Sequence, residues 1–83
     1  MEKSWSVYML RCADNTLYTG VSNNVEKRVL VHNTSKMGAK YTSSRRPVVL
    51  VYTESNLTRG EALSREAVLR KLPRQTKLLM IKD

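Results

Sequence analysis

The sequence predicts an α/β (α+β) fold in which a small three-stranded, mainly antiparallel sheet is flanked by helices. Successive side chains along residues 4–12 alternate as in a strand, residues 48–52 form a continuous apolar run, and residues 58–61 carry a helix-capping signal. A chain of 83 residues has room for one domain with a modest core. Residues 1–83 are therefore expected to form a single domain.

The first two strands are predicted to form a hairpin. Asp14 and Asn15 lie in the turn at residues 13–16 and tolerate the left-handed backbone that a tight reversal needs. Residues 17–21 should then return beside residues 4–12 as the partner strand. Tyr8 and Tyr18 are accordingly expected on neighbouring strands.

Capping residues and helical periodicity predict three helices. Residues 22–24 provide an N-cap for a helix from about Val25 to Asn33, on which Val25, Val29 and His32 share one face with Arg28 beside them. Thr58 and Glu61 match the capping box of a helix from Arg59 to about Lys71, and residues 74–82 form a short final helix. In the helix from Arg59, Glu66 falls on the core side with Ala62 and Leu69.

Two further segments complete the predicted architecture. The run at residues 48–52 is typical of a central strand that is covered on both faces. Residues 33–46 are rich in serine, threonine and basic residues and are predicted to form a long irregular loop. Long loops in small domains are often functional.

The charge balance favours a polyanionic partner. The net charge is +8 and the sequence pI is about 10.1, with basic residues concentrated between Lys27 and Arg46 and again between Arg65 and Lys82. An ordinary solvated surface is the simpler alternative. Because no apolar stretch or signal sequence stands out, we expect a cytoplasmic protein that does not enter membranes. The single cysteine, Cys12, is expected in the core and excludes an internal disulfide.

Several polar residues are candidates for chemistry, and each has a structural alternative. Glu66 on the inner face of a helix could bind a hydrated Mg²⁺ or form an ion pair with Arg70 four residues later. Arg28 could bind a phosphate or form an ion pair with Glu66. His32 could position water or be an ordinary core histidine. Tyrosine side chains such as Tyr8 are more often core aromatics than bases.

The same residues together resemble a known family. Ser6-Val7-Tyr8, followed ten residues later by Tyr18-Thr19-Gly20, is similar to the two signature strands of the GIY-YIG nucleases. Arg28 and His32 stand where the family carries a helix-borne arginine and, in many members, a histidine. Glu66 in Ser64-Arg65-Glu66-Ala67 looks like its metal-binding glutamate, and the segments 38–42 and 46–47 look like those of the small single-domain branch.

The resemblance implies metal-dependent hydrolysis of phosphodiester bonds, as in the catalytic domains of excision-repair and homing endonucleases. Glu66 would hold one Mg²⁺ or Mn²⁺, and Arg28 would bind the scissile phosphate. Tyr8, with its pKa lowered by Arg28 and Tyr18, would be the general base, although either phenol could take the proton and His32 could assist. Gly20 would let a phosphate or the facing helix approach the strand. Further contacts to nucleic acid are predicted at Lys36, Lys40, Arg45, Arg46, Arg70 and Lys71.

Three functions remain open on these grounds. The first is a monomeric endonuclease that acts on DNA in preference to RNA, in DNA repair or processing. The second is a non-catalytic basic module that binds nucleic acid and is recruited to a larger repair or processing assembly. The third is a protein-interaction domain that uses Trp5 and the apolar C-terminal helix.

Overall fold

The computed structural model describes residues 3–34 and 40–81. Its elements are, in chain order, β1 (Trp5–Arg11), β2 (Leu17–Ser22), α1 (Val25–Thr34), α2 (Lys40–Ser43), β3 (Val49–Leu57), α3 (Arg59–Lys71) and α4 (Arg74–Met80). The strands form one antiparallel sheet in the order β2-β1-β3. This arrangement confirms the predicted fold class.

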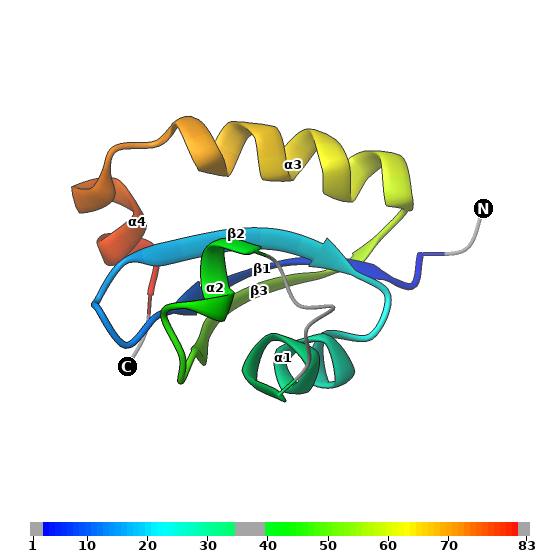
Figure 1. Ribbon diagram of the computed structural model, residues 1–83. Coiled ribbons are helices and arrows are strands. Elements are labelled where there is room, and N and C mark those ends of the chain that lie inside the picture. Colours follow the sequence, from blue (N-terminus) through cyan, green and yellow to red (C-terminus); the bar gives the residue numbers. More distant parts are fainter. Residues whose placement is uncertain (1–2, 35–39, 82–83) are drawn as a thin grey trace.

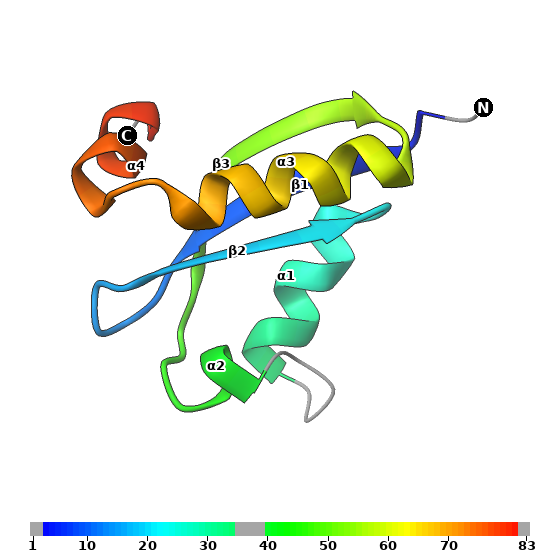
Figure 2. The same ribbon diagram turned by 90° about the horizontal axis from the view of Figure 1, so that it is seen from above.

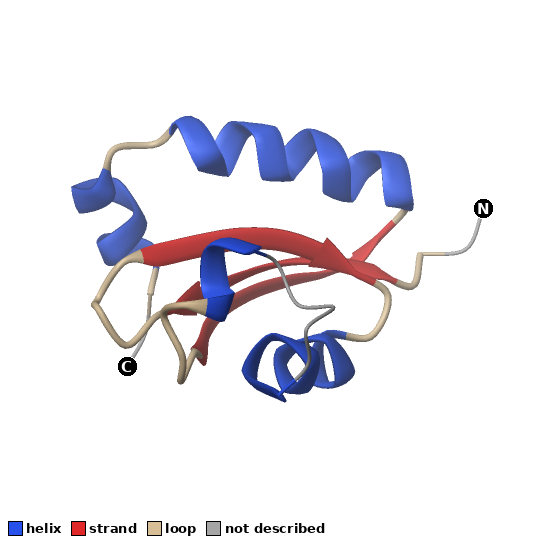
Figure 3. Ribbon diagram, in the orientation of Figure 1, coloured by secondary structure: helices blue, strands red, loops and turns tan. Residues whose placement is uncertain are grey.

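Helices cover the two faces of the sheet (Figure 1). Helix α3 lies along one face, whereas α1 lies against the opposite face, and Figure 2 shows α2 beside the end of α1. Helix α4 follows α3 at the end of the sheet that carries the β1–β2 turn (Figure 3). There, Arg74 Nη2 donates to the Asn15 carbonyl oxygen at 2.8 Å. Of the helices described, none is long and apolar enough to cross a membrane.

Strand β1 supplies core residues to both faces because consecutive side chains of a strand point in opposite directions. Tyr8 and Leu10 join a buried cluster against which Val25 and Val29 of α1 pack. Residues 7 and 9 point to the other face, which α3 covers with its buried residues 62 and 69. The central strand therefore ties the two helical layers into one core.

Short-range polar contacts fix the ends of the elements as the sequence predicts. Asp14 accepts hydrogen bonds from the backbone nitrogen and hydroxyl of Thr16 in the β1–β2 turn, and Asn15 has a positive φ of 70°. Asn24 Oδ1 accepts from the nitrogen of Lys27 at the start of α1. The capping box before α3 is fully formed, and α3 has the predicted bounds.

A side-chain clamp holds the end of α1 against the sheet. The amide group of Asn33 donates to the carbonyl oxygen of Val48 at 3.0 Å and accepts from the nitrogen of Val48 at 2.7 Å. The amide nitrogen and oxygen of the Asn33 side chain thus pair with the backbone carbonyl and nitrogen of Val48, the residue just before β3. The clamp fixes the α1 turn that carries the preceding residue, His32.

The structure corrects three predictions. The run at 48–52 is not a central strand, because β3 lies at the sheet edge, extends to Leu57 and leaves Val49 59% exposed. The segment predicted as an irregular loop contains the short helix α2, and its residues 35–39 lie outside the described part of the chain. The final helix ends at Met80.

Candidate active site

A buried chain of hydrogen bonds links β1, α1 and α2. The Tyr8 hydroxyl lies 2.9 Å from Nε2 of His32, and Nδ1 of the same imidazole lies 2.8 Å from the Thr42 hydroxyl. Tyr8 is 1% exposed, and both His32 and Thr42 are 0% exposed. Sequence reasoning identified Tyr8 and His32 but missed Thr42, although it noted the segment 38–42 as characteristic.

The direction of these hydrogen bonds follows from the partners of Tyr8. The Arg28 guanidinium, which lowers the pKa of Tyr8 by hydrogen bonding, can only donate to the Tyr8 oxygen, so the hydroxyl proton of Tyr8 is available to Nε2 of a neutral His32. A neutral imidazole that accepts at Nε2 carries its proton on Nδ1, which then donates to the Thr42 oxygen. The Thr42 oxygen is thus placed to accept from the tautomer in which His32 can receive a proton from Tyr8.

Tyr18 and Gly20 of β2 shape the space around this chain. The Tyr18 ring lies edge-on to the imidazole of His32, with 5.1 Å between ring centroids, and 6.5 Å from the Tyr8 ring. Gly20 is the cross-strand partner of Tyr8. A Cβ atom at position 20 would lie 2.7 Å from the Tyr8 hydroxyl oxygen and 3.1 Å from Cε2 of Tyr18. The space at Gly20 is thus taken by the Tyr8 phenol and not by the facing helix, whereas the other predicted occupant, a phosphate, stays a prediction.

The pKa of Tyr8 changes in the direction opposite to the prediction. Burial, followed by the nearby Tyr18 phenol, raises the pKa of Tyr8 to about 12, and the negative charge of Glu66 adds to the effect. The hydrogen bond and positive charge of Arg28 lower it, as predicted, but do not outweigh burial. Tyr8 is therefore a protonated hydrogen-bond donor at neutral pH.

His32 is neutral in the same surroundings. Burial lowers the pKa of His32 to about 4, and the positive charges of Arg28 and Arg46 act in the same direction. The neutral ring leaves Nε2 free to accept a proton. The site therefore pairs a protonated phenol with a neutral imidazole.

Glu66 reaches the site from the helix on the other face of the sheet. Its side chain is 19% exposed, and Oε2 lies 3.4 Å from Nη2 of Arg70, as the simpler of the two predictions proposed. The same Arg70 nitrogen lies 3.4 Å from the carbonyl oxygen of Thr19 in β2. Glu66 thus lies beside the strand that carries Tyr18 and Gly20, within electrostatic reach of Tyr8.

The other residues predicted to contact nucleic acid differ in how exposed they are and in whether they already have structural partners. Arg45 forms an ion pair with Asp14 at 2.9 Å, and Arg46 donates to the carbonyl oxygen of His32, so both have structural roles. Arg70 and Lys71 are exposed on α3. The predictions for Lys36 and for the Lys40 side chain lie outside the described residues.

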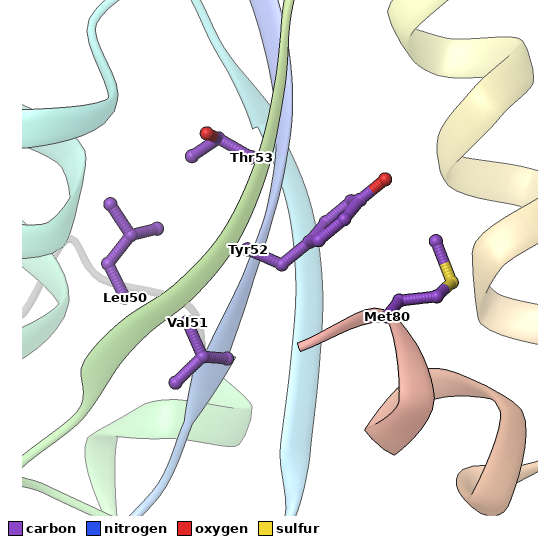
Figure 4. Close-up of a pocket in the computed structure, with 5 residues that line it drawn as sticks. All are labelled: Leu50, Val51, Tyr52, Thr53 and Met80. Carbon is purple, nitrogen blue, oxygen red and sulfur yellow. The ribbon is translucent and has the colours of Figure 1, made fainter. Parts of the chain in front are cut away.

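A hollow at the opposite edge of the sheet contains none of these groups. It is lined by Leu50, Val51, Tyr52, Thr53 and Met80, on β3 and α4 (Figure 4). Within residues 3–34 and 40–81, no three histidine, cysteine, aspartate or glutamate side chains gather into a metal site. The predicted catalytic residues lie instead on β1, β2 and α1, with Glu66 on α3.

The fold and this cluster of residues define a small nuclease-type catalytic domain. The family model of the GIY-YIG catalytic domain matches residues 4–78, and the chain belongs to the GIY-YIG family. It is 52% identical over 77 residues to a UPF0213 protein of Staphylococcus haemolyticus, covering 93% of each chain. It is 47% identical over 79 residues to a UPF0213 protein of Desulfotalea psychrophila, covering 95% of this chain and 72% of the relative.

Two solution structures share the fold. A protein of E. faecalis has a TM-score of 0.60 at 44% sequence identity, over 93% of this chain and 83% of that chain. The UPF0213 protein BH0048 of Bacillus halodurans has a TM-score of 0.56 at 37% identity, over 90% of this chain and 79% of that chain. The relatives named here are thus similar in sequence along most of their length, and the two solved structures are similar in fold as well.

Proposed function

We propose that this chain is a divalent-metal-dependent endonuclease that hydrolyses phosphodiester bonds in nucleic acid, with DNA favoured. The observation that carries the proposal is the Tyr8–His32–Thr42 hydrogen-bond chain beside Arg28, in a domain of a nuclease family. A guanidinium can hold a phosphate, and a phenol bonded to a neutral imidazole can pass on a proton. These are the two tasks that water attack on a phosphodiester requires.

Tyr8 and His32 are proposed to take up the proton that the attacking water loses. As the oxygen of water bonds to phosphorus, one of its protons passes to the Tyr8 oxygen while the Tyr8 proton passes to Nε2 of His32. The bond between phosphorus and the leaving oxygen breaks, and that oxygen departs with the electron pair and takes a proton from solvent. The imidazolium then donates to Thr42 through Nδ1 and to Tyr8 through Nε2. Because the pKa of His32 is about 4 and its ring is buried, the imidazolium returns this proton to the Tyr8 oxygen, from which it passes to solvent when the products leave. Arg28 balances the negative charge that grows on the phosphate oxygens.

Glu66 is the residue proposed to hold Mg²⁺ or Mn²⁺. Mg²⁺ keeps several water ligands and is often bound by one or two carboxylates together with substrate phosphates. A single, mostly buried carboxylate fits this pattern, whereas a site built wholly of protein ligands does not fit the described residues. When bound, the ion would supply Lewis-acid stabilisation of phosphate charge. Arg70 would have to give up part of its contact with Glu66.

A cleavage assay with matched variants tests the proposal. Labelled single-stranded, duplex and branched DNA and RNA are incubated with the wild type, Glu66→Gln and Glu26→Gln in Mg²⁺, Mn²⁺ or EDTA. Glu26 is an exposed carboxylate on α1 and controls for the loss of one negative charge. We expect cleavage by the wild type and Glu26→Gln, and no cleavage by Glu66→Gln or in EDTA. Cleavage by Glu66→Gln at the wild-type rate would refute the role of this carboxylate.

A second candidate function is a non-catalytic module that binds nucleic acid for a larger assembly. It is favoured by the burial of the Tyr8 phenol and by the ion pair that occupies Glu66. This function predicts salt-dependent binding by the wild type and Glu66→Gln alike, with no cleavage of any substrate by either. The same assay therefore decides between the two functions.

A further inference from the structure

A groove opens along β2 on the side of α3 and α4. It is lined by Leu17, Tyr18, Thr19, Arg70 and Lys77. Tyr18 also packs against the imidazole of His32, so one end of the groove adjoins the candidate active site. Lys77 comes from α4, so the groove extends from the site toward the α3–α4 corner.

The groove carries positive charge. The Arg70 side chain is 57% exposed, and one of its guanidinium nitrogens lies 3.4 Å from the Thr19 carbonyl oxygen in the wall of the groove. Nζ of Lys77 lies 3.4 Å from the Arg70 carbonyl oxygen, which holds the ammonium against the end of α3. Glu66, the partner of Arg70, offsets one of these two charges. The groove thus retains a net positive charge beside Tyr18, whose ring continues to the α1 face of the sheet.

A second basic groove lies on the opposite side of the candidate site. It is lined by Ser22, Asn23, Asn24, Lys27, Arg28 and Val31, from the end of β2 and the start of α1. Arg28 belongs to this second groove, and Tyr18 belongs to the first. The β2 residues between the two grooves include Gly20, which lies over the Tyr8 phenol.

We propose that the groove at Arg70 and Lys77 binds a backbone phosphate of the nucleic-acid strand next to the scissile phosphate, with the Tyr18 ring against the adjoining sugar or base. This inference rests on the proposed function and adds the path of the nucleic-acid strand. The nucleic acid crosses β2 from the groove lined by Lys27 and Arg28 to the groove lined by Arg70 and Lys77. Ammonium and guanidinium groups contact backbone phosphates without reading sequence, and aromatic rings accept any base.

Binding measured without cleavage tests this path. A fluorescein-labelled single strand of about 12 nucleotides, a length within the usual range of single-strand sites, is titrated with the full chain in EDTA at several salt concentrations. Wild type is compared with Lys77→Gln, Lys77→Arg and Lys3→Gln. Lys3 is an exposed lysine that lies 3.7 Å from Glu61 and lines neither groove, so it controls for a general loss of charge.

We expect Lys77→Gln to weaken binding roughly threefold or more and to reduce the salt slope by about 0.7, the value for one lost phosphate contact on a single strand. Lys77→Arg should keep the wild-type slope, and Lys3→Gln should change it less. Equal effects of Lys77→Gln and Lys3→Gln, no effect of either, or no binding by the wild type would overturn the inference. The nuclease proposal is judged separately by cleavage in Mg²⁺. Binding in the groove without cleavage would support the path of the nucleic acid but not the nuclease proposal.

Discussion

His32 should stay neutral until the pH falls far below the ordinary range of histidine. Its pKa is 6.5 in an unfolded chain and about 4 in the fold. Because the folded pKa is lowered, the unfolded chain binds more protons in this window, and stability is lost as pH falls from 6.5 toward 4. At about 1.4 kcal/mol for each pKa unit, the full loss from this group is about 3 kcal/mol.

Most of this loss should occur above the pH at which the carboxylates titrate. Between about pH 7 and about pH 5, protonation of the unfolded chain at this one position lowers the free energy of unfolding by about 2 kcal/mol. Glu54, whose pKa the hydrogen bond from Arg65 lowers below its ordinary 4.5, contributes only at lower pH. The window between 5 and 7 therefore isolates the histidine.

Two measurements check this expectation. His32 is the single histidine of the chain, so its imidazole proton resonance can be followed by NMR without assignment by mutation. Its midpoint is expected near pH 4, and urea unfolding between pH 5 and 7 should show the loss of stability. The variant His32→Gln, which has no titrating ring, should lose this pH dependence. A midpoint near 6.5 would show that the imidazole is not held neutral, and the tautomer argument for Thr42 would fall with it.

Two further predictions concern packing and hydrogen bonding at the same site. Gly20→Ala places a Cβ 2.7 Å from the Tyr8 hydroxyl oxygen, so it should lower the free energy of unfolding in urea by about 1–3 kcal/mol and abolish most cleavage activity. The control Gly60→Ala, whose Cβ would meet nothing within 4 Å, should be neutral or stabilising. Equal stability of the two variants would contradict the packing argument. Thr42→Val leaves the buried Nδ1–H of His32 unpaired and should cost about 1–3 kcal/mol and slow cleavage. Thr42→Ser should restore both, and a serine variant as slow as the valine variant would contradict the positioning role.

Local signals in the sequence were sufficient for the hairpin and for α3. The capping box at Thr58 and Glu61 is formed by residues three apart, and it sets the start of α3 without any distant contact. The turn at Asp14 and Asn15 is likewise determined by its own side chains. Such elements can be predicted because their stabilising groups are neighbours in sequence.

The position of β3 in the sheet was not accessible in this way. A continuous apolar run is compatible with a central strand or with an edge strand whose apolar side chains line a surface hollow (Figure 4). Only the long-range pairing of β1 with both other strands decides between them. Helix α2 was missed because a four-residue helix is too short to show helical periodicity.

The sequence predicted which side chains meet better than it predicted their electrostatics. Tyr8, Tyr18 and His32 lie together in the fold, whereas their catalytic roles stay predictions. Whether burial or a neighbouring arginine determines the pKa of Tyr8 depends on how tightly the core closes around it, which the sequence does not contain. The resemblance supplied candidate residues, and packing determined their protonation.

Tyr8 is at once the centre of the hydrogen-bond chain and a member of the buried cluster beneath α1. Substitutions at this position therefore alter stability and chemistry together, and a loss of activity cannot be read as a catalytic effect until folding has been measured. In a redesign of the domain, the site is therefore best altered at exposed positions around it, such as Arg70. Substitutions at these positions leave the packing of the central strand β1 unchanged.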